Sequence, residues 1–314
     1  MTSPSGASFE QDRAAAPAPT GTLAVARGLV RAARPRQWIK SGFVFVPAAF
    51  GGALLTHLGP VLLAAVAFSL AASGLYLVND VCDRESDRLN ERTRRRPIAS
   101  GQVSVPVAVT AGVLLMIVGT GLAVLISWKT AAIVGTYVVC TLAYTFGLKR
   151  MVIVDVMLIA AGFVLRLWGG ATAANVQAST WLLLCMLFLA LFLGFGKRRH
   201  DLLTLKEDAG AHRSVLNEYT PAILNQFLVA TMVSTMLSYA LYVFTSVQAA
   251  AHRGLLLTIP FAVFGVFRYL LVTEVHAQGG APEDLLLSDR PLQLATLGWI
   301  VIAVLSLYVL PGNL

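Results

Sequence analysis

The chain has 314 residues, of which 57% are hydrophobic and 13% are charged. Soluble domains carry about 25% charged residues. This composition, with a mean hydropathy of +0.73 and several long apolar stretches, therefore indicates an integral membrane protein. No stretch alternates polar and apolar residues with period 2, so we expect an all-α protein. The net charge of +8 matches the usual excess of Lys and Arg in cytoplasmic loops, and no nucleic-acid partner is expected.

The first segment, residues 1–25, is rich in Ala, Pro, Ser, Thr and Gly and lacks the apolar core of a signal peptide. This composition predicts a disordered cytoplasmic tail. Residues 26–314 are predicted to form one transmembrane domain.

Nine membrane-spanning helices are predicted from the apolar stretches. They cover approximately residues 41–58, 60–80, 104–127, 130–148, 151–172, 180–197, 221–246, 255–273 and 291–311. The first is short and contains Pro47, Gly51 and Gly52, which predicts a kink or a tilt.

Basic residues predict the orientation of these helices. Of the 24 lysines and arginines, all but Lys129, Arg166 and Arg253 fall in the N-terminal tail or in loops on the same side as that tail. This asymmetry predicts a cytoplasmic N-terminus and an external C-terminus. It also places the polar segments described below on the cytoplasmic face of the membrane.

The most informative segment, residues 79–87, follows the second predicted span and reads NDVCDRESD. Asp80, Asp83 and Asp87 are spaced i, i+3 and i+7, which places them on one helical face. Carboxylates repel one another at this spacing, and they lie at a helix end whose dipole is already negative. A divalent cation would offset both costs. Oxygen ligands suit Mg²⁺, which binds through a few carboxylates and substrate phosphates.

An arginine run follows in residues 94–101, which read RRRPIASG. Acids that bind a metal, next to Arg95 and Arg96, suit a diphosphate, since the guanidinium groups neutralise the oxygens that the metal does not bind. The alternative for the arginines alone is a solvated cytoplasmic loop.

A second basic group, residues 197–201, closes the sixth predicted span. Lys197 and Asp201 share a helical face, and Arg198 lies beside them. These cations complement the helix dipole. Alternatively, they form a second anion-binding group that faces the aspartates.

Two further groups lie in the fourth and fifth predicted spans. Tyr144 and Lys149 suit a phosphate, or they are an interfacial aromatic with a snorkelling cation. Asp155 and Arg166 lie about 16 Å apart along one helical face, and an arginine this deep is expected to face the interior and to be paired.

A basic and aromatic segment precedes the first predicted span. It contains Arg34, Arg36, Trp38 and Lys40. The segment is either an interfacial anchor or a contact for a lipid phosphate.

These motifs together resemble the UbiA superfamily of intramembrane prenyltransferases. The resemblance rests on the aspartate pattern at 79–87 and on the Arg-Pro-x-x-x-Gly stretch at 96–101, and it extends from Arg34 to about Leu310. It implies a nine-helix bundle around a central cavity, with a polar cytoplasmic cap, a lateral opening to the lipid bilayer and Mg²⁺ as cofactor.

One departure from the family pattern refines this resemblance. Most members with aromatic acceptors have a second aspartate-rich motif between the sixth and seventh spans, where this chain has a basic run with Asp201. The pattern is similar to the branch that transfers phosphoribose to decaprenyl phosphate, in which this acid is usually Glu. The features that carry the similarity are residues 34–38, 144–149, 197–201, Tyr219-Thr220, Pro282-Glu283-Asp284 and Asp289-Arg290.

The resemblance implies a pentosyltransferase that moves 5-phosphoribose from phosphoribosyl pyrophosphate to a polyprenyl phosphate and releases pyrophosphate, in the supply of arabinan to a bacterial cell wall. The residues that it implies for metal binding are Asn79, Asp80, Asp83 and Asp87. Those implied for catalysis are Asp80, Asp83, Asp87 and Lys197. Those implied for substrate binding are Arg34, Arg36, Lys40, Asn79, Arg95, Arg96, Tyr144, Lys149, Arg166, Arg198 and Asp201.

Two alternatives remain at this point. One is a prenyltransferase with an aromatic acceptor and a polyprenyl diphosphate donor, against which the single acid between the sixth and seventh spans counts. The other is a transporter or lipid-binding protein without chemistry, against which the one-sided polar groups count. No sequence feature specifies the length of the lipid or an oligomeric state.

Overall fold

The computed structural model describes residues 21–309 except 92, 206–213, 248–250 and 276–281, and every regular element in that part of the chain is a helix. Eight segments are long and apolar enough to cross a membrane, and they match the last eight predicted spans. Their helices are α3 (Leu58–Cys82), α5 (Val105–Val124), α6 (Trp128–Phe146), α7 (Val154–Ala173), α8 (Thr180–Leu205), α10 (Pro221–Thr245), α12 (Ile259–Val275) and α14 (Arg290–Val304).

Short helices connect or extend these spans. They are α1 (Thr22–Ala32), η1 (Pro35–Val44), α2 (Phe45–Phe50), α4 (Arg84–Leu89), η2 (Leu148–Arg150), η4 (Ser214–Glu218), η5 (Arg253–Thr258), α13 (Pro282–Ser288) and η6 (Leu305–Val309). Helix α1 begins at Thr22, inside the range 1–25 that was predicted as a tail, and residues 1–20 lie outside the described chain.

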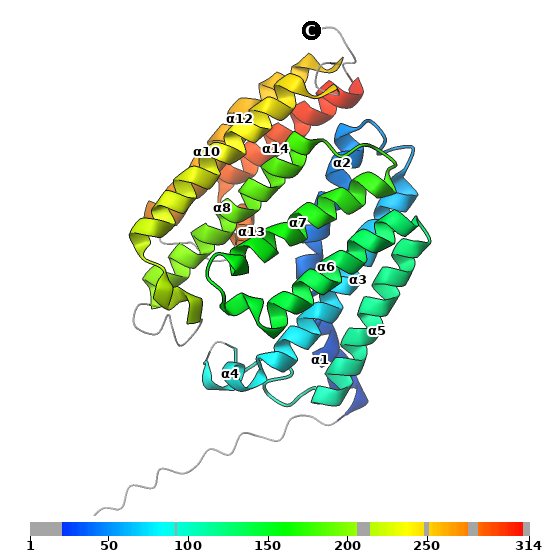
Figure 1. Cartoon of the computed structure of the whole chain (residues 1–314), viewed down its shortest axis with the longest axis vertical. Helices are drawn as coiled ribbons and strands as arrows, with labels where there is room; N and C mark the ends of the chain where they lie inside the picture. The colour runs from blue at the N-terminus through cyan, green and yellow to red at the C-terminus, as the bar shows by residue number, and fades with distance from the viewer. Residues whose placement is uncertain (1–20, 92, 206–213, 248–250, 276–281, 310–314) are drawn as a thin grey trace, which may run out of the picture.

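The segment 41–58, predicted as a kinked or tilted membrane-spanning helix, is not a single helix in the structure. The chain there forms the 3₁₀ helix η1 and the six-residue helix α2, and Gly52 has a φ of +67° just beyond α2. Pro47 has no N–H for the carbonyl group of Phe43, and its ring would clash with that carbonyl in a regular α-helix. Ten residues of 3₁₀ helix and six of α-helix together extend about 29 Å, close to the thickness of a bilayer core. The broken segment runs from the end of the bundle near α1 to the end near α2 (Figure 1).

Helix α3 lies at the centre of one half of the bundle, where it contacts α5, α6, α7 and η1 (Figure 1). Its buried Phe68 packs edge to face on Tyr137 of α6. In the other half, α8 packs on α10, and α12 packs on α14. Glycine allows the closest contact between segments, because a Cβ atom on Gly170 of α7 would lie 1.9 Å from the carbonyl oxygen of Val44. The same packing holds η1 firmly against α7.

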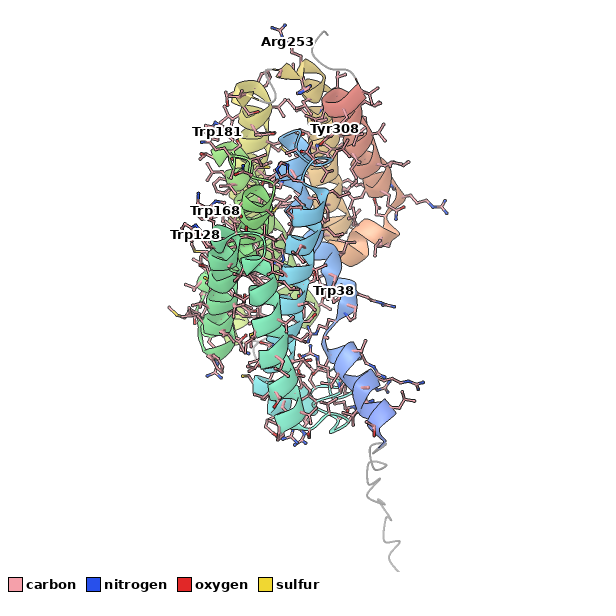
Figure 2. The ribbon with its side chains drawn as sticks, turned by 90° about the vertical axis from the view of Figure 1, so that its right-hand side faces the viewer. Trp38, Trp128, Trp168, Trp181, Arg253 and Tyr308 are labelled. Carbon is pink, nitrogen blue, oxygen red and sulfur yellow. The ribbon has the colours of Figure 1, made fainter. Side chains whose placement is uncertain are left out.

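The outer faces of the bundle carry large apolar side chains. Figure 2 shows Trp128, Trp168 and Trp181 along one side, and all three are exposed. Trp38 is also exposed, although its indole nitrogen donates to Ser73 Oγ at 3.0 Å. Apolar side chains on the outside suit a lipid environment, and tryptophan is typical of the interface between lipid and water.

The side chain of Asp289 contacts both α12 and α14. Its Oδ1 accepts a hydrogen bond from the backbone N–H of Leu292, so it caps α14, and its two carboxylate oxygens pair with Arg268 of α12 at 3.1 and 2.8 Å. We expect Asp289→Ala to lower the melting temperature by roughly 2–4 °C, the scale of one lost helix cap. Asp289→Asn keeps the cap and should lower it less. Thermal unfolding of the purified protein in detergent measures both, and equal losses would contradict the capping role.

Candidate active site

The aspartate segment lies where α3 gives way to α4. Helix α3 ends at Cys82, Asp83 has non-helical backbone angles, and α4 begins at Arg84. The three aspartates therefore do not lie on one continuous helix, which corrects the prediction from their spacing. Carboxylates on one face would repel one another at the negative end of the α3 dipole, and the break turns Asp83 away from the other two.

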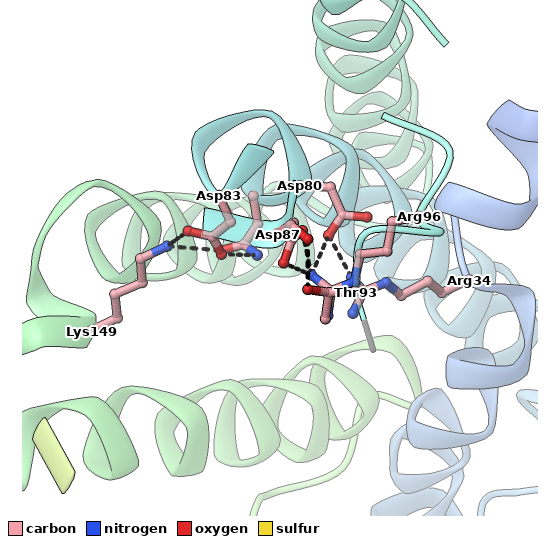
Figure 3. Close-up of polar contacts among 8 residues, drawn as sticks. Arg34, Asp80, Asp83, Asp87, Thr93, Arg96 and Lys149 are labelled. Atoms are coloured by element: carbon pink, nitrogen blue, oxygen red, sulfur yellow. Dashed lines mark hydrogen bonds and ion pairs between the residues drawn. The ribbon is translucent and has the colours of Figure 1, made fainter. Parts of the chain in front are cut away.

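Asp80 and Asp87 share cationic partners. Arg34 Nη2 contacts Asp80 Oδ1 at 2.5 Å, and Arg96 Nη1 lies 3.5 Å from the same oxygen. Arg96 also donates to both oxygens of Asp87 at 3.0 and 2.7 Å. The Asp80 side chain is only 2% exposed, so these guanidinium groups supply the compensation that a buried charge requires. One arginine thus brings two of the predicted metal ligands together (Figure 3).

Asp83 belongs to a second group on the other side of the segment (Figure 3). Lys149 Nζ of η2 contacts Asp83 Oδ1 at 2.5 Å and lies 3.5 Å from Asn79 Oδ1. The amide nitrogen of Asn79 donates to Asp83 Oδ2 at 3.0 Å. We call the seven residues of both groups the aspartate cluster: Arg34, Asn79, Asp80, Asp83, Asp87, Arg96 and Lys149. All seven were among the predicted site residues, and the structure brings them together.

The predicted metal site can be tested against these positions. Within the described ranges, no three acid, histidine or cysteine side chains lie close enough together to hold one metal ion. The set of three aspartates is thus not assembled as predicted, because Asp83 pairs with Lys149 instead. Asp80 and Asp87 alone suit Mg²⁺, which commonly takes one or two carboxylates and completes its shell with water and substrate phosphates. Their oxygens already meet cations here, so the donor chemistry fits this metal.

The second basic group lies partly in the protein interior. Arg198 of α8 is 2% exposed, and its Nε donates to Oδ2 of the fully buried Asp155 at 2.8 Å. Asp201 lies 3.9 Å from Arg198 Nη1. Among the described residues, Arg198 Nη2 has no hydrogen-bond partner. Most of this guanidinium group therefore serves a buried ion pair.

Tyr219 joins the same buried group. Its hydroxyl accepts from the backbone N–H of Ile153 at 2.8 Å. Burial raises the pKa of Tyr219 above its ordinary value, and Asp155 lies close enough to raise this pKa further. The phenol therefore stays neutral.

Arg166 lies deep in α7, as predicted, and is 5% exposed. It donates to Tyr137 Oη at 2.7 Å and to the Gly162 carbonyl at 3.0 Å. Its guanidinium group also lies over the rings of Tyr137, Phe68 and Phe163, at 4.5 to 6.0 Å. The expected pairing is met by a hydroxyl, a carbonyl and aromatic faces. Asp155 pairs with Arg198 and not with Arg166.

The other predicted residues lie around these groups. Arg36, Arg95 and Lys197 are exposed, and Lys40, Tyr144 and Asp201 are partly buried. Tyr144 lies in the last turn of α6, one helical turn before η2 and Lys149. The side chains of Pro282, Glu283 and Asp284 lie outside the described residues.

Two supporting residues of the aspartate cluster were not predicted. Thr93 Oγ1 donates to the Asp87 carbonyl at 3.1 Å, and the Arg34 guanidinium lies 5.0 Å from the centre of the Tyr76 ring. Tyr76 precedes Asp80 by one helical turn, and this i, i+4 spacing is a signal that sequence reasoning could have used.

The chain is similar to known proteins over most of its length. The chain is 33% identical over 296 residues to a decaprenyl-phosphate phosphoribosyltransferase of Corynebacterium glutamicum, covering 91% of this chain and 89% of that protein. It is 36% identical over 279 residues to the protein of that name in Mycobacterium tuberculosis, covering 87% and 92%.

A solved structure supports the fold. A UbiA homolog from Archaeoglobus fulgidus, bound to DMAPP and Mg²⁺, has a TM-score of 0.67 at 17% identity and covers 90% of this chain and all of that one. The UbiA prenyltransferase family matches residues 41–282, a range that contains six of the seven residues of the aspartate cluster. The chain therefore belongs to the UbiA prenyltransferase family.

Proposed function

We propose that the protein transfers a 5-phosphoribosyl group from phosphoribosyl pyrophosphate to a polyprenyl phosphate, with decaprenyl phosphate as the acceptor. The observation that carries the proposal is the nearly full-length similarity to proteins named decaprenyl-phosphate phosphoribosyltransferase. The aspartate cluster supports it, because three carboxylates and three cations meet at one end of the bundle.

The proposed reaction breaks the bond between C1 of the ribose and the pyrophosphate oxygen. An oxygen of the acceptor phosphate forms the new bond to C1, and pyrophosphate leaves with the electron pair. The acceptor is already anionic near neutral pH, so no strong base is needed. The protein has to hold two anionic groups in line and neutralise their charge, which electrostatic preorganisation achieves.

The residues of the aspartate cluster divide these tasks. Asp80 and Asp87, with Asn79 and Asp83 nearby, would hold Mg²⁺, which when bound neutralises charge on the pyrophosphate. Lys149 and Arg96 each reach an aspartate and would also reach the phosphates of a donor bound there. Arg34 contacts Asp80 and directly precedes η1, whose Arg36 is exposed, so Arg34 would contact the acceptor phosphate. Lys197 and Arg198 would bind the 5-phosphate.

The donor is water-soluble and the acceptor is a lipid, so the site belongs at a membrane surface. We place the aspartate cluster on the cytoplasmic side of a bacterial inner membrane and the C-terminus outside, because the loops at this end carry most of the basic residues. Helix α1 and the end of α14 lie at opposite ends of the bundle (Figure 1), as this arrangement requires.

The function is tested with membranes that contain the protein. They are incubated with labelled phosphoribosyl pyrophosphate, Mg²⁺ and a polyprenyl phosphate, and the lipid phase is then extracted and counted. Label in the lipid phase supports the proposal. Absence of label, with prenylation of an aromatic acid from a polyprenyl diphosphate, would instead support an aromatic prenyltransferase.

Lys149 provides a more specific prediction. We expect Lys149→Met to raise the KM for phosphoribosyl pyrophosphate by roughly tenfold or more, the effect of one charge-assisted hydrogen bond to a phosphate. The matched control is Lys129→Met. It removes an exposed lysine at the start of α6, the helix whose other end leads into η2 and Lys149. Initial rates at varied donor concentration measure both variants. An unchanged donor KM in Lys149→Met would remove this residue from the donor site.

A further inference from the structure

The chain makes a strained turn just before α7. The N–H of Val154 donates to the carbonyl of Val152 at 2.8 Å, which closes a γ-turn around Ile153. Ile153 has φ +69° and ψ −47°, the rare and strained form of this turn. A β-branched residue at positive φ is an outlier, and such outliers often mark functional sites. Ile153 is 40% exposed, so burial of its side chain does not offset this strain.

A buried network holds the strained turn in place. Tyr219 is 5% exposed, and its hydroxyl accepts a hydrogen bond from the N–H of Ile153 itself. The same hydroxyl interacts with Asp155, two residues further on, and Asp155 is bound by Arg198 of α8. The turn is thus fixed at its most strained residue by a side chain that precedes α10, and the network behind it reaches α8. Three separate segments converge on one backbone group.

The turn also determines where Lys149 lies. Lys149 belongs to η2, which ends three residues before Ile153. The intervening residues are tied together, because Met151 donates to the Leu148 carbonyl and its own carbonyl accepts from the N–H of Asp155. Helix η2 also contacts η4, the segment that leads into Tyr219. A change of φ at Ile153 would therefore redirect η2 and move the Lys149 ammonium group away from Asp83.

We infer that Tyr219 is a positioning residue, which holds the strained γ-turn at Ile153 so that Lys149 reaches the aspartate cluster. Asp155 and Arg198 lie behind Tyr219 and orient its hydroxyl. The step from Lys149 to donor binding rests on the proposed function. The mechanical part, in which Tyr219 compensates strain at Ile153, does not depend on it.

The strain itself provides the test. Glycine adopts positive φ without steric cost, so Ile153→Gly should make the turn independent of Tyr219. We expect Tyr219→Phe to raise the donor KM roughly five- to tenfold, the effect of one buried hydrogen bond, with kcat changed less than about twofold. The double variant Tyr219→Phe/Ile153→Gly should return the donor KM to within about twofold of the wild type. In a Lys149→Met background, Tyr219→Phe should have no further effect on this KM.

Thermal unfolding in detergent gives a second readout that needs no substrate. Tyr219→Phe should lower the melting temperature, and Ile153→Gly should restore most of that loss in the double variant. The matched control is Tyr239→Phe, which removes another buried hydroxyl. Tyr239 lies in α10, and its hydroxyl is hydrogen-bonded to Thr258 of η5 and to Trp299 of α14. Ile153→Gly should not restore the melting temperature of Tyr239→Phe, and the donor KM of Tyr239→Phe should equal that of the wild type.

The outcomes separate this inference from the proposed function. If the wild type neither binds nor consumes phosphoribosyl pyrophosphate, the proposed function fails, and the melting temperatures still decide the role of Tyr219. If Ile153→Gly does not restore the stability of Tyr219→Phe, the inference is overturned. A full-sized effect of Tyr219→Phe on the donor KM in the Lys149→Met background would also overturn it, because Tyr219 would then act by another route.

Discussion

The substitution Asp80→Asn is expected to lower turnover by roughly a hundredfold or more while the protein remains folded. The change keeps the shape of the side chain but removes the negative charge that Arg34 and Arg96 both approach. Asp80 is also the most buried oxygen ligand that the site offers to Mg²⁺. Loss of one preorganised electrostatic group in an active site commonly costs this much.

Turnover is measured at increasing Mg²⁺ concentration, with the melting temperature in detergent recorded in parallel. The control is Glu85→Gln, since Glu85 lies in the same segment but its side chain is 76% exposed. The control should keep near-wild-type activity. If Asp80→Asn keeps it too, at ordinary Mg²⁺, then neither the metal nor the charge balance at Asp80 contributes to the reaction.

The second large effect is expected from Gly170→Ala. A Cβ atom there would lie 1.9 Å from the Val44 carbonyl oxygen and 2.7 Å from its carbon, both of which are backbone atoms. Backbone cannot move aside as a flexible side chain does, so α7 and η1 would have to separate. We expect a loss of at least about 3 kcal/mol in the free energy of unfolding.

Gly135→Ala in α6 is the matched control, because nothing lies within 4 Å of a Cβ atom at that position. Alanine is favoured over glycine inside a helix by about 0.5–1 kcal/mol, so this variant should be as stable as the wild type or more stable. The yield of monodisperse protein and its thermal unfolding measure both variants. A wild-type melting temperature for Gly170→Ala would show that the contact between α7 and η1 adjusts without cost.

Much of the membrane architecture could be predicted from the sequence. The lengths of the apolar stretches and the polar loops between them predicted eight of the nine spans correctly, because each long helix satisfies its own backbone hydrogen bonds. The first predicted span is instead a 3₁₀ helix followed by a short α-helix, in which Pro47 supplies no N–H to the carbonyl group of Phe43. Composition does not distinguish these two helix types, since both bury the same apolar residues against α3 and α7.

The aspartate cluster was predicted in its members but not in its pairing. The spacing of Asp80, Asp83 and Asp87 indicated one face, whereas the structure divides them between two sets of cations. Asp83 pairs with Lys149, which comes from a distant part of the chain, and local spacing carries no information about such a partner. The positive φ of Ile153 was equally hidden, because isoleucine gives no signal for it.

The distances along the chain between these partners have a consequence for biosynthesis. Arg34 meets Asp80 after 46 residues, Asp83 meets Lys149 after 66, and Ile153 meets Tyr219 after another 66. A ribosome that makes the chain from its N-terminus releases these partners in that order. The aspartates emerge before the lysine that pairs with Asp83, and the turn that carries this lysine emerges before the tyrosine that fixes it. The site is therefore completed only when synthesis has passed residue 219, and a nascent chain that stops earlier holds the aspartates without the support of the turn.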